Sequence, residues 1–193
     1  MSLLRRSREP SLEYLVAGLG NPGPRYADTR HNLGRLVVEL LAGELGGSWR
    51  SRWNGRVSEL RDGDRRLALL VPETFMNESG RSLAPALRFY KLPPERLLVV
   101  HDELDLELGD VRAKRGGGLA GHNGLKSLKR ELGSPDFVRV RAGVGRPDST
   151  DPEIVSSWVL GRFSESEAEV EDLVARACAE VERVVLEPDG AAA

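Results

Sequence analysis

The chain has 193 residues, 40% of them hydrophobic, and a formal net charge of −2, as expected of one globular domain with a sizeable core. It lacks both the roughly 18 consecutive apolar residues of a membrane helix and the apolar run of a signal peptide, so membrane insertion and secretion are not expected. A single cysteine, Cys178, excludes an internal disulfide and fits a reducing cytosol, and three histidines leave little for a structural zinc site.

Strands and helices are predicted to alternate along the first half of the chain. Short apolar runs bounded by Gly, Pro or Asp indicate strands, and apolar residues at helical spacing indicate helices. The predicted elements are a strand at residues 14–17, a helix from Leu33 to Leu45 stopped by Gly46-Gly47, a hairpin of residues 57–60 and 67–71 around Asp62-Gly63-Asp64, a helix at residues 79–92 and a buried strand at residues 97–101. Pro85 is expected to kink or restart the second helix.

The second half contains one clear strand and one long helix. Residues 137–144 alternate with period two, which places Arg139 and Arg141 together on one face of a strand, opposite its valines. Residues 165–186 have a single apolar face that includes Cys178, and we expect a capping box at Ser164-Glu165-Ser166-Glu167 to open this helix. Cys178 is therefore interpreted as a core residue.

These elements predict the α/β class. We expect a single-domain, three-layer sandwich with a mixed, largely parallel central sheet flanked by helices, the hairpin supplying the antiparallel part. Residues 11–187 are predicted to form this domain, with a disordered or extended leader at residues 1–10 and a flexible tail at residues 188–193.

Five segments carry unusual polar residues, mostly at strand ends or helix starts, where α/β folds place their sites. They are Gly20-Asn21-Pro22-Gly23, Thr29-Arg30-His31-Asn32, Phe75-Met76-Asn77, His101-Asp102-Glu103 and Gly121-His122-Asn123-Gly124. A histidine with a pKa of about 6.5 can take a proton from water, a carboxylate can fix its tautomer, and asparagine amides match the hydrogen-bonding groups of a peptide backbone. The set indicates hydrolysis of a peptide-bearing substrate by activated water.

Each segment also has a simpler structural interpretation. Asn21 and Asn123 stand beside glycines and suit turns or helix caps, and Asp102 suits a helix N-cap. His101 suits the core, and His122 the surface of a glycine loop. Met76 and Phe75 are more often core residues than a substrate platform.

Two other site types are weighed against these segments. The spacing Gly18-x-Gly20-x-x-Gly23 fits a dinucleotide loop, but helical periodicity starts only near Leu33, and the acid about 20 residues on, Glu39, falls inside that helix. No serine lies in a Gly-x-Ser-x-Gly elbow, which disfavours a nucleophile-elbow hydrolase.

The small net charge hides two segments of opposite sign. Residues 111–146 contain nine Lys or Arg and two acidic residues, and residues 163–190 contain nine acidic residues and two Arg. A basic face beside an acidic one is compatible with a polyanionic partner, and equally with two solvated faces.

Together the polar segments resemble the bacterial peptidyl-tRNA hydrolase family, in order, from about Tyr14 to Gly161. The matching motifs are Gly18-Leu19-Gly20-Asn21-Pro22-Gly23, Tyr26-Ala27-Asp28-Thr29-Arg30-His31-Asn32-Leu33-Gly34, Thr74-Phe75-Met76-Asn77-Glu78-Ser79-Gly80, His101-Asp102-Glu103-Leu104-Asp105, and Gly116-Gly117-Gly118 through Gly121-His122-Asn123-Gly124-Leu125-Lys126.

The resemblance implies a role for each matching residue. His31 matches the family's catalytic histidine, which activates water, Asp102 the carboxylate that orients it, and Asn21 the asparagine near the scissile ester. The positions implied to bind substrate are Tyr26, Met76, Asn77, His122 and Asn123. Lys114 and Arg141 match the basic pair that clamps the tRNA 5′-phosphate.

The implied function is hydrolysis of the ester between tRNA and a peptide or N-blocked aminoacyl group, which recycles tRNA released prematurely from ribosomes. The implied partner is peptidyl-tRNA, through its acceptor end and its peptide. The resemblance also implies a cytoplasmic monomer that needs no metal and no cofactor. Family members usually extend past the last long helix, whereas this chain ends in Glu187-Pro188-Asp189-Gly190 and three alanines, which leaves the closure of the far cleft wall open.

Two rival functions remain. One is a catalytically inactive RNA-binding relative of the same fold, similar to organellar splicing factors. The other is a metallohydrolase using His31, His101, His122 and Asp102, which is disfavoured because neighbouring side chains on a strand diverge.

Overall fold

The computed structural model describes residues 12–62 and 65–187 and shows one seven-stranded sheet. The strands are β1 Tyr14–Gly18, β2 Arg50–Arg52, β3 Gly55–Asp62, β4 Arg65–Pro72, β5 Leu97–Glu103, β6 Val111–Arg115 and β7 Val138–Gly143. Their order across the sheet is β2-β3-β4-β1-β5-β7-β6. The predicted leader at residues 1–10, the predicted tail at 188–193 and the hairpin turn at 63–64 lie outside the described residues.

The sheet is mixed, with its parallel part at the centre. β4, β1, β5 and β7 run parallel, while β3 and β2 extend one edge and β6 the other in antiparallel pairing. All seven residues of β5 are buried, which confirms the predicted buried strand at residues 97–101. The predicted 57–60 and 67–71 hairpin is β3 and β4, with Val57 opposite Leu70.

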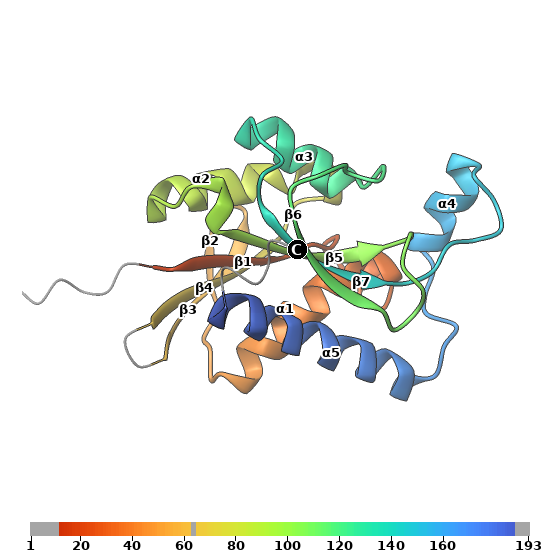
Figure 1. The fold of residues 1–193 in the computed structure, drawn as a ribbon, viewed down its shortest axis with the longest axis horizontal. Coiled ribbons are helices and arrows are strands. Elements are labelled where there is room, and N and C mark those ends of the chain that lie inside the picture. Colours follow the sequence, from red (N-terminus) through yellow and green to blue (C-terminus); the bar gives the residue numbers. More distant parts are fainter. Residues whose placement is uncertain (1–11, 63–64, 188–193) are drawn as a thin grey trace, which may run out of the picture.

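Helices cover both faces of this sheet. The helices are α1 Leu33–Glu44, α2 Gly80–Tyr90, α3 Asn123–Leu132, α4 Pro152–Val159 and α5 Glu167–Leu186. Figure 1 shows α2 and α3 on one face, α1 and α5 on the other, and α4 beyond one end of the sheet. One apolar cluster joins the sheet to α1 and α5, and a second joins it to α2 and α3. The predicted three-layer α/β sandwich is confirmed. Among the described residues, no helix is long and apolar enough to cross a membrane.

The structure departs from the sequence analysis within α2, at the start of α5 and at four elements that were not predicted. α2 runs through Pro85 without a restart, because the one hydrogen bond that proline removes belongs to the carbonyl of Arg81, an exposed residue. The capping box of α5 is formed by Ser166 and Glu169, two residues later than expected. The hydroxyl of Ser164 instead accepts a hydrogen bond from the Arg30 guanidinium, so it is not available as a cap. The sequence analysis also missed β2, β6, α3 and α4.

Cys178 packs in the core as predicted. It lies on the apolar face of α5 between the sheet and α1 and is 5% exposed. Burial, together with the nearby carboxylates of Glu44 and Glu182, raises the pKa of the thiol to about 12, so it stays protonated at neutral pH.

Candidate active site

A cavity of about 680 Å³ opens at the edge where the parallel strands end. Asn21 follows β1, Met76 follows β4, and Asp102 is the second-to-last residue of β5. Because parallel strands end at the same sheet edge, these distant segments meet there. All eight predicted catalytic and substrate-binding residues line the cavity: Asn21, Tyr26, His31, Met76, Asn77, Asp102, His122 and Asn123.

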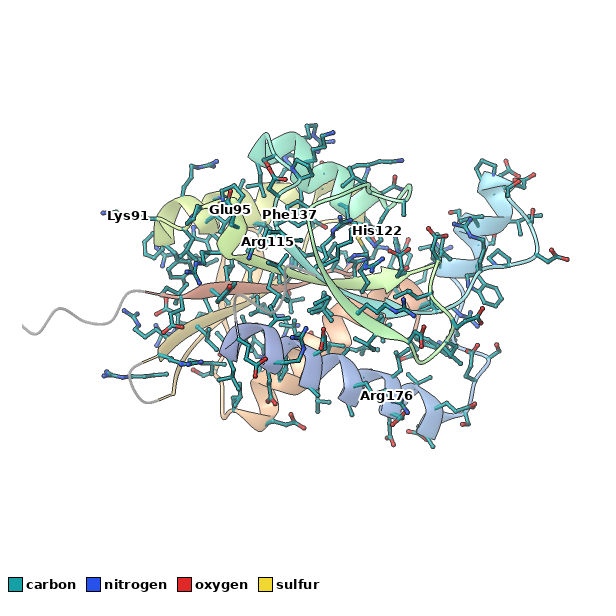
Figure 2. The ribbon with its side chains drawn as sticks, viewed as in Figure 1. Lys91, Glu95, Arg115, His122, Phe137 and Arg176 are labelled. Atoms are coloured by element: carbon teal, nitrogen blue, oxygen red, sulfur yellow. The ribbon has the colours of Figure 1, made fainter. Side chains whose placement is uncertain are left out.

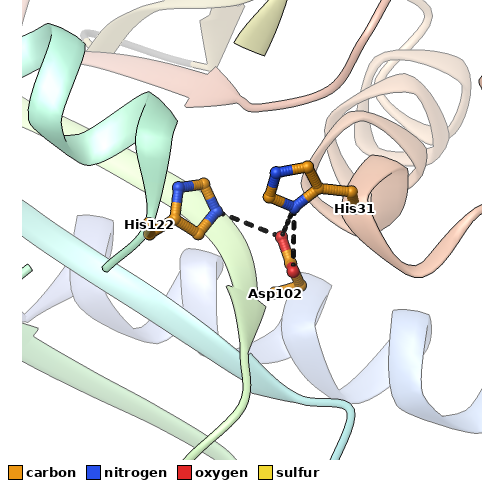
Figure 3. A group of neighbouring side chains, drawn as sticks. All are labelled: His31, Asp102 and His122. Atoms are coloured by element: carbon orange, nitrogen blue, oxygen red, sulfur yellow. Dashed lines mark hydrogen bonds and ion pairs between the residues drawn. The ribbon is translucent and has the colours of Figure 1, made fainter. Parts of the chain in front are cut away.

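His31 and Asp102 form a buried pair in the wall of the cavity, and Figure 3 shows the two side chains facing each other. The His31 Nδ1 lies 2.9 and 3.0 Å from the two carboxylate oxygens of Asp102. The carboxylate can only accept, so Nδ1 carries the proton and Nε2 is left with a free lone pair. Burial by itself lowers the pKa of His31, but the charge and hydrogen bond of Asp102 outweigh it, and the pKa is raised above 6.5.

Asp102 also accepts a hydrogen bond from a second histidine, His122 (Figure 3). The His122 Nε2 lies 3.1 Å from Asp102 Oδ1. The His122 Nδ1 accepts from the backbone N–H groups of Gly124 and Leu125, at 3.1 and 3.4 Å, and so caps α3. This leaves the proton on Nε2, and since burial lowers the pKa of His122, the ring is neutral at neutral pH. His122 is therefore a helix cap with a nearly buried side chain, and Asn123 is not the cap.

Asp102 remains ionised between these two rings. Burial by itself raises the pKa of Asp102, but attraction to His31 and His122 and the hydrogen bonds from both outweigh it, and the pKa is lowered. Asp102 lies within β5, so its interpretation as a helix N-cap is wrong.

The His101 side chain leaves β5 on the other side from that of Asp102, as the alternation of a strand requires, and touches this group through the His122 ring. The His101 Nδ1 donates to the backbone carbonyl of Asp102 at 2.7 Å, and its ring meets the edge of His122. Burial, together with the neighbouring His122, lowers the pKa of His101 to about 3. His31, Asp102 and His122 each offer one possible ligand atom within 4.8 Å of the others, and His101 is not among them. The four-residue metal set considered from the sequence is not brought together.

Asn21 joins two loops at the cavity wall. Its backbone N–H donates to Asn32 Oδ1 at 2.7 Å, and its backbone carbonyl accepts from Asn32 Nδ2 at 3.0 Å. Its side-chain Oδ1 accepts from the backbone N–H of Met76 at 2.8 Å. With these groups occupied, the polar group of Asn21 left for a ligand is the side-chain NH₂.

Asn77 and Asn123 are exposed at the cavity rim, and among the described residues neither side-chain amide makes a hydrogen bond. Both amides are thus free to bind a ligand. Beside them Tyr26 meets Phe75 edge-on, with ring centroids 6.5 Å apart, and Phe75 is 55% exposed. The core interpretation of Phe75 is therefore wrong, whereas Met76 is both buried and part of the cavity wall.

A sequence model of the peptidyl-tRNA hydrolase family matches residues 15–192. The chain belongs to the peptidyl-tRNA hydrolase family. It is 48% identical over 168 residues to the peptidyl-tRNA hydrolase of Azorhizobium caulinodans, covering 86% of this chain and 81% of that one. It is 53% identical over 155 residues to that of Geotalea daltonii, covering 79% of each. A crystal structure of peptidyl-tRNA hydrolase from Acinetobacter baumannii has the same fold, with a TM-score of 0.83 and 37% identity over 95% of this chain and 93% of that one.

Family membership confirms the enzyme class expected from the sequence, a hydrolase of peptidyl-tRNA. It also argues against a dinucleotide site, and the structure of the glycine loop contradicts that interpretation independently. Two short 3₁₀ turns, Pro24–Tyr26 and Arg30–Asn32, separate the glycine loop from α1. A Cβ on Gly18 would lie 2.3 Å from the carbonyl oxygen of Gly34, so this glycine serves the packing of α1 on β1. Glu39 pairs with Arg35 and Arg56 on the surface of α1.

One wall of the peptidyl-tRNA hydrolase cavity was missed in the sequence. It is formed by α4 and the residues after it: Pro152, Val155, Ser156, Val159 and Leu160. Asp151 caps α4 by accepting from the backbone N–H of Glu153 at 2.8 Å, and Pro152 is the first helical residue. A cap followed by proline is a known helix start, so Asp151-Pro152 was the signal that could have revealed α4.

Arg30 connects this wall to the turn that carries His31, and the sequence analysis likewise missed it. Its guanidinium, beside His31 in the chain, donates to the carbonyl of Arg162 at 2.6 Å and pairs with Glu165 at 3.1 Å. It also lies 4.0 Å above the Trp158 ring. The residue is only 3% exposed.

The two predicted phosphate-binding residues lie outside the cavity. Lys114 on β6 pairs in register with Arg139 on β7, and Arg141 lies two residues further along the same face. Residues placed diagonally in this way have Cβ atoms roughly 7–8 Å apart. Lys114 is exposed, and Arg141 lies 3.9 Å from the carboxylate of Glu103. Arg139 is buried and donates to the carbonyl of Gly118 at 2.7 Å, which anchors the neighbouring glycine loop.

Proposed function

We propose that this chain hydrolyses the ester bond between a peptide, or an N-blocked aminoacyl group, and tRNA, with His31 as general base, and so recycles tRNA released prematurely from ribosomes. The observation that carries the proposal is the state of His31. Its Nδ1–H is held by a buried carboxylate, and its Nε2 faces away from Asp102 with a free lone pair (Figure 3). A base of this kind can take a proton from water at neutral pH.

In the proposed reaction, His31 Nε2 removes a proton from water while the water oxygen bonds to the ester carbonyl carbon. Asp102 stabilises the resulting imidazolium and keeps it oriented. The tetrahedral intermediate then expels the ribose oxygen, which takes the proton back from His31 Nε2. The products are the peptide acid and tRNA with a free terminal hydroxyl.

Asn21 is proposed to stabilise the negative oxygen of the intermediate. Its side-chain NH₂ is the polar group left over after the contacts to Asn32 and Met76, and it borders the cavity. A donor aimed at the developing charge contributes about 10²–10³ in rate. The unpaired amides of Asn77 and Asn123 are proposed to bind the peptide backbone, beside Tyr26 and His122. A free aminoacyl-tRNA offers a charged amine in place of that acyl group and is expected to be spared.

The reaction is proposed to need no metal and no cofactor. The nitrogens of His31 and His122 that face Asp102 both carry protons, because the carboxylate accepts from each of them. A metal ligand must be an unprotonated nitrogen. The Nδ1 of His122 is occupied by two backbone N–H groups at the start of α3, so the ring cannot reverse without uncapping that helix.

The tRNA is proposed to reach the site along the basic strands, with Lys114 and Arg141 clamping its 5′-phosphate. A lysine and an arginine at diagonal positions on one face of two neighbouring strands suit a phosphate group. A cytoplasmic monomer is part of the same proposal, since peptidyl-tRNA arises at the ribosome and the residues proposed to act on it all come from one chain.

The decisive assay follows hydrolysis of N-acetyl-aminoacyl-tRNA and of unblocked aminoacyl-tRNA, each with and without a chelator. We expect turnover of the blocked substrate alone, unchanged by the chelator. Turnover lost to the chelator would support the metallohydrolase. Binding of tRNA without turnover would support the inactive RNA-binding relative.

A further inference from the structure

Both polar atoms of the Asn32 side chain form hydrogen bonds with the backbone of one other residue, Asn21. Asn32 is 1% exposed, and its two polar atoms contact the N–H and the carbonyl of Asn21, at 2.7 and 3.0 Å. Asn32 is also the N-cap of α1, yet its side chain makes no capping hydrogen bond. A helix-capping role therefore does not account for this buried amide.

This double contact fixes the peptide group on each side of Asn21. The Asn32 amide accepts from the N–H and donates to the carbonyl of the same residue, as a paired backbone would in a sheet. Rotation of the Asn21 backbone would therefore break both hydrogen bonds together. The approach is close, since a Cβ on Gly20 would lie 3.1 Å from Asn32 Oδ1. The loop after β1 is therefore held against the start of α1 at the position of Asn21.

With its backbone fixed, Asn21 has one side-chain orientation that satisfies its surroundings. Its Oδ1 accepts from the Met76 backbone N–H at 2.8 Å, which directs the NH₂ group away from Met76. Exchanging the oxygen and nitrogen of this amide would place a donor against a donor. The direction of the NH₂ group thus depends on Asn32 and on the Met76 backbone.

We propose that Asn32 is a positioning residue for the reaction, which aims the Asn21 NH₂ at the developing oxyanion. The inference rests on the proposed function. Asn32 itself does not touch the reacting atoms. One 3₁₀ turn, Arg30–Asn32, thereby places the base and, through Asn32, the oxyanion donor, so their separation is set by a single rigid segment.

The test is a double-mutant cycle of Asn32→Ala and Asn21→Ala, with kcat, KM and the pH dependence of kcat measured on N-acetyl-aminoacyl-tRNA. Asn21→Ala should lower kcat about 10²–10³-fold. Asn32→Ala should lower kcat at least roughly tenfold with KM changed much less, because a small misplacement of a catalytic donor is costly. In the Asn21→Ala background, Asn32→Ala should add little, since the group that it positions is already gone.

Two further variants separate positioning from loss of structure. Asn32→Asp keeps the shape and the acceptor but loses the donor to the Asn21 carbonyl. If the alanine variant does not fold, kcat of Asn32→Asp is compared with the wild type in its place. Ser127→Ala removes another buried side chain that binds a backbone N–H, that of Gly80 at 3.0 Å, away from the cavity. Ser127→Ala should lose stability and keep kcat. The pH limb of kcat should be unchanged in Asn32→Ala, because the pair of His31 and Asp102 is intact.

The outcomes distinguish this inference from the function on which it rests. If the wild type turns over and Asn21→Ala is impaired while Asn32→Ala and Asn32→Asp keep wild-type kcat, the positioning role is overturned and the function stands. Equal losses from Asn32→Ala in both backgrounds would also overturn it, because the two residues would then act independently. A wild type without turnover would instead refute the proposed function. A fully active Asn21→Ala would refute the oxyanion role of Asn21, and with it the positioning role of Asn32, while the hydrolysis itself would stand.

Discussion

Asp102 accepts hydrogen bonds from two histidines, His31 and His122. Their chemistry differs because the second nitrogen of each ring has different contacts. The Nδ1 of His122 accepts from the first backbone N–H groups of α3, whereas the Nε2 of His31 has no hydrogen-bond partner among the described residues. The pKa of His31 is raised above 6.5, while that of the buried His101, next to Asp102 in β5, is lowered to about 3. Protonated His31 therefore stabilises the fold below pH 6.5, and this stabilisation is lost as pH rises through its raised pKa. His101 acts oppositely, because its protonation destabilises the fold as pH falls from 6.5 toward 3.

Replacing His31 by Ala should abolish most hydrolysis and leave tRNA binding nearly intact. We expect kcat to fall by about 10²–10⁴-fold or more, since this range is the usual contribution of general-base catalysis. Wild-type kcat should rise with pH through one ionisation above 6.5, because only neutral His31 can accept the proton. That limb should be absent in His31→Ala. Asp102→Asn should lower kcat less, by favouring the wrong tautomer. Retention of both turnover and limb in His31→Ala would exclude His31 as the base.

At the scale of elements, the site depends on how α4 is attached. α4 packs at the end of the sheet, and Arg30 holds the segment that follows it, through the Arg162 carbonyl, Ser164 and Glu165. The backbone adds two links, from the Arg30 N–H to the Gly161 carbonyl and between Thr29 and Arg162. The cavity wall formed by α4 is thus anchored directly to the turn that carries His31.

Arg30→Ala should therefore destabilise the protein and loosen this wall. The variant loses the hydrogen bonds to the Arg162 carbonyl and to Ser164 and the pair with the partly exposed Glu165, and a hydrogen bond to a charged group contributes about 1.5–3 kcal/mol. Denaturant unfolding and limited proteolysis of residues 150–165 would measure the two effects. Arg162→Ala is the matched control, since its side chain is 74% exposed and pairs with Asp28 at 3.7 Å at the surface. Equal stability of the two variants would contradict the role assigned to Arg30.

Across the whole molecule, the charged segments found in the sequence separate onto different faces. β6, α3 and β7 carry the basic residues, and α5, on the opposite face of the sheet from α3, carries the acidic ones. Figure 2 shows His122 at the start of α3 and Arg176 on α5 at the opposite side of the molecule. The small net charge therefore does not conflict with an RNA substrate.

If Lys114 and Arg141 hold the tRNA 5′-phosphate, replacing either by Ala should weaken binding and flatten its dependence on salt. Each phosphate contact contributes roughly 0.7–0.9 to the slope of log affinity against log salt. Binding titrations at several salt concentrations would give the slopes. Arg176→Ala serves as control, because this exposed residue pairs with Asp172 on the acidic helix. The same slope in the wild type and the Lys114→Ala, Arg141→Ala double variant would refute the clamp.

The sequence by itself determined the elements with regular periodicity and the set of residues at the site. β5, α1 and α5 were predictable because burial on one or both faces imposes an apolar pattern that extends over consecutive residues. The eight cavity residues were predictable because their motifs are specific. Short elements such as β2, on an exposed edge, leave no such pattern.

Only the tertiary structure decided how these residues act. His31 meets Asp102 across 71 positions of sequence, and Arg30 meets Arg162 across 132. The free Nε2 of His31 and the neutral, capping state of His122 follow from contacts with distant segments. Asn32 resembles an ordinary helix cap in the sequence, and its buried amide is explained only by the loop that folds back against it. Tautomers, pKa shifts and buried polar contacts depend on which groups are close in space, and no local pattern records that proximity.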